Sequence, residues 1–214
     1  LVDWDLAFFQ AFDLAGVSGV VSHTAPAPLP TAREIADSLV DTLFEQVAVR
    51  GIFHADLHPG NIILRADREI TLIDFGSVGI LERSMRRALI AMMAAMDAED
   101  DIALTDLLLM VAGTPVDGSE LDRAGLQHEI GVILTKVHNG PTDAAIFGEV
   151  LGVLQHHQLA LPPALVLVFR TIASLEGTVR RLVPGYDMVE QALSRTTHFA
   201  SLTFSPKELF ADAR

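Results

Sequence analysis

The sequence predicts a mostly helical α+β fold in which one short β-hairpin separates a first helix from a helical bundle. Three observations lead to this class. Apolar residues at helical spacing run over 31–49, two strand-like segments follow at 62–65 and 69–73, and a helical pattern resumes at Glu82 and continues to the end. The chain has 214 residues, which is enough to bury a substantial core in one or two domains.

The composition excludes several classes of site and partner. The chain has no cysteine, so disulfides, thiolate zinc sites and cysteine nucleophiles are excluded and a cytoplasmic location is expected. The formal net charge of -13 argues against nucleic acid as a partner. The apolar run 161–169 is too short to span a membrane and is ended by Arg170. Because the first residue is Leu1 rather than Met, we expect the sequence to belong to a longer chain.

The first part of the chain contains a clear helix start. Residues 1–30 are interpreted as a divergent N-terminal helix with an aromatic stripe, followed by a Pro-rich connector over 21–30. Thr31 and Glu34 then fit the S/T-x-x-E capping box, which predicts an amphipathic helix reaching about Val49. A loop, the hairpin and its polar turn come next.

The second part of the chain reads as a series of packed helices. We assign 31–195 to one domain and 196–214 to a C-terminal tail. Glycine and proline pairs divide the helical pattern at Gly113–Pro115, Gly140–Pro141, Pro162–Pro163 and Pro184–Gly185.

The segment HADLHPGN (54–61) and the DFG at 74–76 together predict phosphoryl-transfer chemistry, because they fit the pattern H-x-D-x-x-x-x-N followed by D-F-G. Phosphoryl transfer needs an aligned acceptor and metal ions that neutralise charge on the phosphates, and Mg²⁺ takes oxygen ligands. Asp56 would therefore act as the catalytic residue that orients or deprotonates the acceptor. Asn61 and Asp74 would hold Mg²⁺ and, through it, ATP.

Three further residues of the pattern are expected to support this site. His54 opens the loop, Phe75 would pack beneath it, and Gly76 would give the backbone room to turn. The hairpin between the two motifs folds back on itself, which would bring Asn61 and Asp74 together.

Two other interpretations of the same segment stay open. It could be a polar loop without chemistry, or His54, Asp56 and His58 could alternate along a strand and bind a metal ion from one side. The turn expected at Pro59–Gly60 argues against the metal site. Elsewhere, the pair His156–His157 is expected to lie at the surface near a helix end.

Three segments together resemble the UbiB/AarF-type atypical kinases: FHADLHPGNIIL (53–64), LIDFGSVGIL (72–81) and LPPALVLVFRTIASLEGTVRRLVPGYD (161–187). The likeness covers about 32–190 and implies a protein-kinase-like C-lobe, in which the hairpin carries the catalytic and DFG loops. It also implies a link to ubiquinone and isoprenoid-lipid metabolism, with peripheral association at the inner face of a membrane. By this resemblance Asp56 corresponds to the catalytic aspartate, and Asn61 and Asp74 to the magnesium positions.

The part of a kinase that grips the nucleotide phosphates is missing from the sequence. The only lysines are Lys136 and Lys207, both after Asp74, and 1–30 do not match an N-lobe. We therefore expect the N-lobe to be supplied in cis or in trans, and the chain to self-associate through the apolar face left uncovered. The alternatives are a non-catalytic, kinase-like binding module and a relative of the aminoglycoside and choline phosphotransferases, whose catalytic loop HADLHPGN also resembles.

Overall fold

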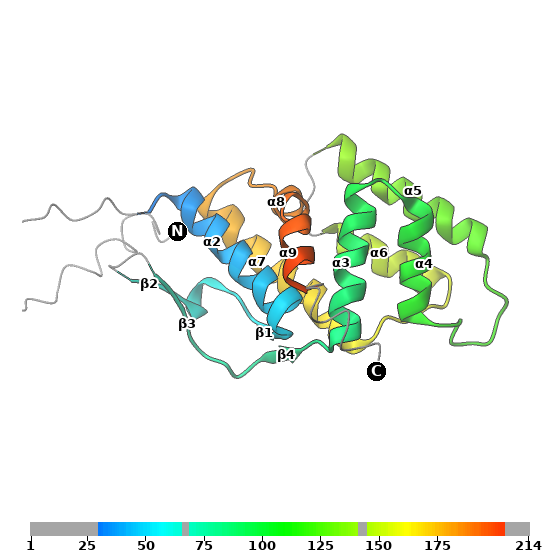
Figure 1. Ribbon diagram of the computed structural model, residues 1–214, viewed down its shortest axis with the longest axis horizontal. Coiled ribbons are helices and arrows are strands. Elements are labelled where there is room, and N and C mark those ends of the chain that lie inside the picture. The colour runs from blue at the N-terminus through cyan, green and yellow to red at the C-terminus, as the bar shows by residue number, and fades with distance from the viewer. Residues whose placement is uncertain (1–29, 66–68, 141–144, 204–214) are drawn as a thin grey trace, which may run out of the picture.

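The computed structural model describes residues 30–65, 69–140 and 145–203 (Figure 1). The predicted N-terminal helix, nearly all of the connector, the turn at Asp67 and the residues after 203 lie outside the described residues.

The described part of the chain contains two short strand pairs and a larger set of helices. The N-terminal elements are α2 (Ala32–Phe44), the π-helical turn η1 (Glu45–Arg50), β1 (Ile52–His54), the 3-10 turn η2 (Pro59–Asn61), β2 (Ile62–Leu64), β3 (Ile70–Leu72) and β4 (Val78–Ile80). The remaining helices are α3 (Arg83–Asp97), α4 (Asp101–Ala112), α5 (Arg123–Asn139), α6 (Ala145–His156), α7 (Pro163–Leu182), α8 (Met188–Ser194) and α9 (Thr196–Thr203).

Helix α2 begins at the predicted capping box. The backbone N–H of Glu34 donates to the Thr31 hydroxyl at 3.2 Å, and the Glu34 carboxylate accepts from the Thr31 N–H at 2.7 Å. The two bonds satisfy amide groups that have no partner inside the helix. Gly51 ends η1 in the left-handed region, with φ of 72°, so the helical segment covers the predicted range to Val49.

The predicted hairpin is confirmed as β2–β3, in which Ile62 lies opposite Leu72. A second antiparallel pair, β1–β4, was not predicted, and it places Phe53 opposite Gly79. Its strands have three residues each, and most of the candidate site lies between them in the sequence. They are therefore not joined by a short turn that a sequence pattern could reveal. The pairing joins the two ends of the segment 52–80, which contains both the HADLHPGN and the DFG motifs.

The register of β1–β4 depends on a glycine. Phe53 is 1% exposed, and a Cβ added at Gly79 would come within 2.1 Å of the Phe53 ring. The ring therefore fills the space where a side chain at position 79 would stand, so the close strand approach requires glycine.

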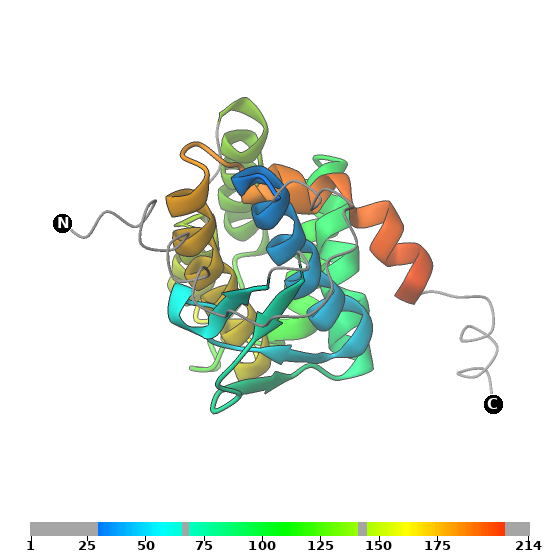
Figure 2. The same ribbon diagram turned by 90° about the vertical axis from the view of Figure 1, so that its left-hand side faces the viewer.

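Two hydrophobic cores occupy the two halves of the molecule. One lies among α2, β1, α7 and α8 and includes Leu39, Phe53 and Leu175, while the other lies among α3–α6 and includes Leu126 and Ile130. Figure 2 shows the strand pairs beside α2 and α7, whereas α4–α6 lie at the other end (Figure 1). This arrangement confirms the mostly helical α+β class.

The last described helix is part of the first core. Residues 196–203 fall in the range assigned to the tail, yet they form α9, and Phe199 stacks on Phe44 with ring centroids 6.0 Å apart. The buried Thr203 hydroxyl donates to the Ala48 carbonyl at 3.1 Å. Among the described residues, none of the helices is both long and apolar enough to cross a membrane.

Candidate active site

The buried imidazole of His54 links the two predicted motifs. Its Nδ1 accepts from the Asp56 backbone N–H at 3.2 Å, and its Nε2 lies 2.9 Å from the Ile73 carbonyl. Because Nδ1 accepts, Nε2 carries the proton and donates to Ile73, which is the neutral tautomer. The Gln46 side chain accepts from the His54 N–H at 2.9 Å, so η1 also fixes this residue.

Asn61 and Asp74 stand at adjacent ends of the β2–β3 hairpin. The Ile73 N–H donates to the Asn61 carbonyl at 2.9 Å, which continues the ladder by one residue. The buried Asn61 side chain donates through Nδ2 to the Asp56 carbonyl at 3.0 Å. The structure thus brings Asn61, Asp74 and the backbone of Asp56 together, with Ile73 held by both His54 and Asn61.

Asp74 has an unusual backbone conformation. Its φ of 60° lies in the left-handed region, which asparagine and aspartate tolerate better than most side chains. The Gly76 N–H donates to Asp74 Oδ1 at 3.2 Å, and this turn holds the carboxylate. A Cβ at Gly76 would stand 3.1 Å from the same oxygen, so glycine lets the turn close without crowding the carboxylate.

Phe75 does not pack into the core as a buried side chain. It is 61% exposed, and its ring meets His54 edge-on with centroids 5.0 Å apart. We expected Phe75 to pack beneath the loop. The ring does contact the loop residue His54, but most of its surface is exposed to solvent.

Asp56 presents a half-exposed carboxylate next to His58. Oδ2 of Asp56 lies 3.6 Å from Nε2 of His58, and the Gly60 N–H donates to Nδ1 of His58 at 3.0 Å. The acceptor role of Nδ1 leaves the proton of a neutral ring on Nε2, facing Asp56. A Cβ at Gly60 would come 2.8 Å from the imidazole, so this glycine permits the arrangement.

The alternative metal site of His54, Asp56 and His58 is contradicted by these contacts. Both ring nitrogens of His54 are engaged with backbone groups, and β1 ends at His54, so the three residues do not alternate along a strand. Within the described ranges, the side chains that converge as a potential metal cluster are other ones, on α5 and α6.

Helix α7 holds the backbone on both sides of Asp56. The buried Thr178 hydroxyl donates to the Leu57 carbonyl at 2.9 Å. The Thr171 hydroxyl lies 3.4 Å from the Ala55 carbonyl and bonds more closely to Leu167 O within its own helix, at 2.8 Å. The two threonines are seven residues apart, about two turns, on the buried face of α7, so this helix contacts the loop through the Ala55 and Leu57 carbonyls.

The segment after α7 anchors α2. The Tyr186 hydroxyl donates to Asp37 Oδ1 at 2.7 Å, and Arg33 lies over the Tyr186 ring, 4.9 Å from its centroid. Burial, followed by the hydrogen bond to Asp37, raises the pKa of the Tyr186 hydroxyl well above its usual range. Tyr186 therefore stays neutral and connects the third sequence motif to the first helix.

The donors at the site match a hard cation. Asn61 contributes an amide and Asp74 a carboxylate. Asn61 directly precedes β2, and Asp74 lies two residues after the end of β3, so both stand at the same end of one hairpin. Magnesium prefers such oxygen ligands and retains waters in its remaining positions.

Comparison with known proteins gives the same family for both halves of the chain. Residues 25–107 match the ABC1 atypical kinase-like domain, and residues 143–187 match the UbiB helical domain. The chain belongs to the UbiB/AarF family of atypical kinases. The kinase-like character of the predicted fold class is thereby confirmed, and kinase-like proteins in general use a nucleotide and a metal ion.

Several proteins can be aligned with most of the chain. A probable protein kinase UbiB of Shewanella baltica is 28% identical over 184 residues, which are 82% of this chain and 33% of that protein. Protein ACTIVITY OF BC1 COMPLEX KINASE 7, chloroplastic, of Arabidopsis thaliana is 26% identical over 197 residues, with shares of 90% and 28%. An uncharacterized protein of Synechocystis sp. is 31% identical over 191 residues, with shares of 82% and 45%. The chain thus spans 28% to 45% of the length of these relatives.

Three positioning residues were missed by the sequence interpretation. Gln46, Thr171 and Thr178 hold the backbone of the loop around Asp56. The two threonines do leave a signal, because they stand seven residues apart on a helix face that is mostly apolar. Gln46 leaves none, since its role depends on the π-helical turn that aims it at His54.

Proposed function

We propose that this chain forms the base-and-metal half of an atypical kinase or ATPase site that acts on Mg²⁺–ATP. The observation that carries the proposal is the hydrogen-bonded connection of the two motifs through Ile73, whose carbonyl bonds to His54 Nε2 and whose N–H donates to the Asn61 carbonyl, at 2.9 Å each. The β2–β3 hairpin brings Asn61 and Asp74 together, and the contacts of Ile73 join this end of the hairpin to the loop that carries Asp56.

Each residue has a specific part in this proposal. The Asn61 amide oxygen and the Asp74 carboxylate would hold Mg²⁺, which when bound neutralises charge on the nucleotide phosphates. Asp56 would accept the hydrogen bond of the attacking hydroxyl or water and align it. His58, with Nε2 3.6 Å from the Asp56 carboxylate, would orient that carboxylate. His54 would keep both loops in register and take no part in proton transfer.

The phosphate grip would come from an N-lobe in cis or in trans. No lysine precedes Asp74 in this sequence, although kinases use a lysine of the N-lobe on the α and β phosphates. The N-lobe would cover the apolar face formed by Ile52, Phe75, Val78 and Ile80, which are 44% to 69% exposed. We therefore expect the chain by itself to bind nucleotide weakly, with a Kd of about 1 mM or higher, equivalent to roughly 4 kcal/mol.

Calorimetric titration with ATP tests this proposal directly. The wild type is titrated at millimolar ATP with and without Mg²⁺, beside Asp74→Asn and a control, Asp106→Asn, whose carboxylate pairs with Arg123 on α5. We expect Mg²⁺-dependent binding in the wild type and the control, and at least tenfold weaker binding in Asp74→Asn, about 1.4 kcal/mol. Equal binding by Asp74→Asn would exclude Asp74 as a metal ligand.

The role of Asp56 needs a measurement of turnover. With the N-lobe supplied, Asp56→Asn should keep nucleotide affinity and lose at least 100-fold in kcat, because a positioned base contributes 10²–10⁴-fold. Unchanged turnover would mean that Asp56 neither orients nor deprotonates the acceptor.

A non-catalytic binding module is the second candidate, which would keep the loop geometry described above and carry out no phosphoryl transfer. Folded protein that binds ATP with equal strength in the presence and absence of Mg²⁺, or that binds no nucleotide once the N-lobe is present, would support this candidate over the kinase.

A link to ubiquinone or isoprenoid-lipid metabolism and association with the inner face of a membrane belong to the same proposal, on the strength of the family resemblance. Flotation with neutral and anionic phospholipid vesicles tests the membrane part. Co-migration with either kind of vesicle would support it, and recovery of all the protein in the lower fraction would contradict it.

A further inference from the structure

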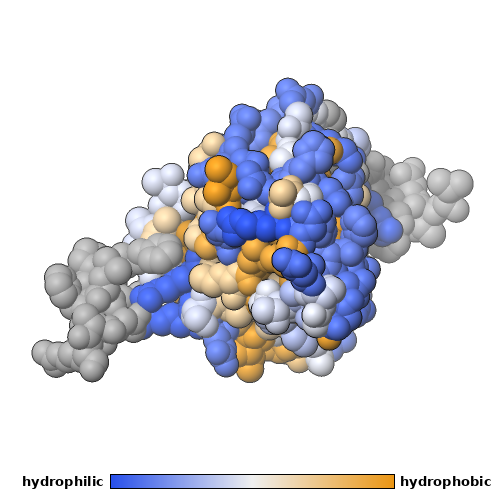
Figure 3. Space-filling view, turned by 90° about the vertical axis from the view of Figure 1, so that its right-hand side faces the viewer, coloured by the Kyte–Doolittle hydropathy of each residue, from blue (hydrophilic) through white to orange (hydrophobic). Residues whose placement is uncertain are grey.

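A second group of potential metal ligands lies away from the candidate active site. It consists of Glu129 in the middle of α5, His156 at the end of α6, and His157 directly after it. Figure 1 shows α5 and α6 at the end of the molecule opposite β2 and β3, and Figure 3 views this end, where hydrophobic areas alternate with hydrophilic ones. The nucleotide chemistry proposed above makes no use of these residues.

The three side chains converge on one point. Glu129 Oε1 lies 3.1 Å from Nδ1 of His156 and 3.2 Å from Nε2 of His157, and the ligand atoms of all three lie within 4.8 Å of one another. In a tetrahedral zinc site, bonds of about 2.0–2.1 Å place neighbouring ligand atoms about 3.3 Å apart. The two separations from Glu129 are close to this value, so side-chain movements that adjust the spacing of the two imidazoles would bring all three ligand atoms onto one ion.

The backbone fixes the positions of the two histidines. Helix α6 ends in a Schellman motif, in which the Leu159 N–H donates to Leu154 O at 2.8 Å and the Gln158 N–H to Gln155 O at 3.0 Å. Gln158 adopts the left-handed conformation that this motif requires, with φ of 56°. Its carbonyl accepts from the Val116 N–H at 2.8 Å, which ties the turn to the connection between α4 and α5.

The exposure of the three side chains is graded from solvent to interior. The His156 side chain is 71% exposed, that of Glu129 34%, and that of His157 8%. An ion can therefore enter past His156, while Glu129 and His157, whose side chains are less exposed, provide ligands that are already ordered and need little further loss of side-chain freedom.

We propose that Glu129, His156 and His157 form a binding site for a divalent transition metal ion of the zinc class. Two imidazole nitrogens and one carboxylate oxygen, with a fourth position open to water, are a donor set that zinc and its neighbours accept. Magnesium prefers oxygen ligands alone, so the site is chemically distinct from the one at Asn61 and Asp74. The ion joins α5 to the end of α6 and so stabilises the second core.

The proposal competes with a simpler role, in which the histidines only donate hydrogen bonds to Glu129. Zinc titration separates the two. The full chain, prepared without a histidine tag and treated with a chelator, is titrated with Zn²⁺ in a calorimeter, and the same samples are titrated with Mg²⁺. We expect one Zn²⁺ per chain and no heat from Mg²⁺ that competes with it.

Three variants locate the site, and one controls for the loss of an imidazole. Glu129→Gln, His156→Gln and His157→Gln should each weaken Zn²⁺ binding at least tenfold, whereas His128→Gln, an exposed neighbour of Glu129 on the same helix, should bind like the wild type. His156 is mostly exposed, so its variant should keep the fold even if substitution of the less exposed His157 does not. Circular dichroism checks the fold of each.

Cobalt substitution adds a readout of geometry. Co²⁺ should give visible absorption bands of a four- or five-coordinate ion with nitrogen ligands, and Zn²⁺ should remove them. Absence of Zn²⁺ binding in folded wild type would overturn the proposal, as would equal Zn²⁺ affinity in all four variants. Either outcome would leave Glu129 as a hydrogen-bond acceptor for the two histidines.

Discussion

The Thr178 hydroxyl on α7 donates to the Leu57 carbonyl at 2.9 Å, across 121 residues of sequence. Leu57 directly follows Asp56, and on the other side of Asp56 the Ala55 carbonyl faces Thr171 at 3.4 Å. The third family motif thus acts on the first through backbone contacts. A loop that must place one carboxylate within a few tenths of an ångström needs such support, because catalytic geometry is lost quickly when a loop moves.

Thr178→Val should destabilise the protein by about 1–2 kcal/mol, because it keeps the side-chain shape and leaves the buried Leu57 carbonyl without this donor. Urea unfolding followed by circular dichroism measures the change. Thr135→Val serves as the control, since Thr135 is exposed and donates to the Gly131 carbonyl of its own helix. An effect of Thr178→Val no larger than that of the control would show that the contact contributes nothing to stability.

Gly79→Ala should destabilise the fold by about 1–3 kcal/mol, the usual cost of overpacking a core. Its Cβ would stand 2.1 Å from the Phe53 ring, which is almost fully buried and cannot move aside easily. Gly177→Ala provides a matched substitution, because Gly177 lies inside α7 and a Cβ there meets nothing within 4 Å. That variant should instead stabilise the protein by about 0.5–1 kcal/mol. Thermal unfolding measures both variants. A change of stability in the same direction for Gly79→Ala and Gly177→Ala would show that the contact with the Phe53 ring does not decide the effect.

Asp41 should make stability depend on pH in the mildly acidic range. Burial raises the pKa of Asp41 above its ordinary value of 3.8, and the paired Arg195 opposes this rise. Nearby Asp37 raises the pKa and His198 lowers it. The folded state binds the Asp41 proton more tightly than the unfolded state does. The contribution of protonated Asp41 to stability is therefore complete below the pKa that Asp41 has in the unfolded chain, and it is lost as pH rises through its pKa in the folded protein.

The measurement is the free energy of unfolding of wild type and Asp41→Asn from about pH 3.5 to pH 6.5, a range set by the direction of this shift. Asparagine mimics the protonated side chain, so the variant should gain stability relative to the wild type as pH rises. In Arg195→Gln the loss should move to higher pH, since the attraction that opposes the shift is removed. A difference between wild type and Asp41→Asn that is constant over the range would contradict the assignment.

The outer face of β1–β4 should drive self-association when no N-lobe covers it. Ile52 and Ile80 are paired across the strands and are 58% and 69% exposed. Exposed apolar surface of this kind promotes association. Ile52→Thr combined with Ile80→Thr keeps β-branched side chains, so the strands should form while the tendency to associate falls.

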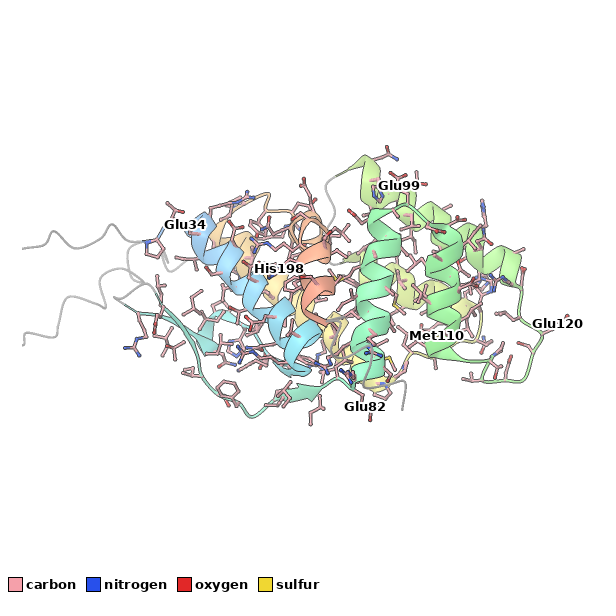
Figure 4. All side chains as sticks on the ribbon, in the orientation of Figure 1. Glu34, Glu82, Glu99, Met110, Glu120 and His198 are labelled. Carbon is pink, nitrogen blue, oxygen red and sulfur yellow. The ribbon has the colours of Figure 1, made fainter. Side chains whose placement is uncertain are left out.

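Sedimentation velocity over a hundredfold range of concentration tests this prediction. The control combines Met110→Gln with Val116→Thr, which removes apolar side chains that are 66% and 71% exposed elsewhere. Figure 4 places Met110 and Glu120 at the end of the molecule far from Glu34. A wild type that remains monomeric throughout, or a control that reduces association as much as the strand variant, would show that the face is not responsible.

Much of the fold could be predicted because its signals are local. The capping box at Thr31 fixes the start of α2 through bonds three residues apart, and the β2–β3 hairpin follows from two short β-prone segments around a turn. The β1–β4 pair could not be predicted in the same way. Its strands are too short to be distinctive, and their register depends on the fit of the Phe53 ring against Gly79.

The sequence by itself identified the family and singled out the residues of the candidate site. The order and spacing of His54, Asp56, Asn61 and Asp74 restrict the possible reactions, because only certain side chains can serve as bases or metal ligands, and these are visible as letters. Only the tertiary structure decided how those groups are held. The tautomer of His54, the left-handed Asp74, the support from Thr178 and the meeting of Glu129 with His156 and His157 all depend on which distant segments pack together. That packing minimises exposed apolar surface and unpaired polar groups over the whole chain at once, and no short stretch of sequence encodes it.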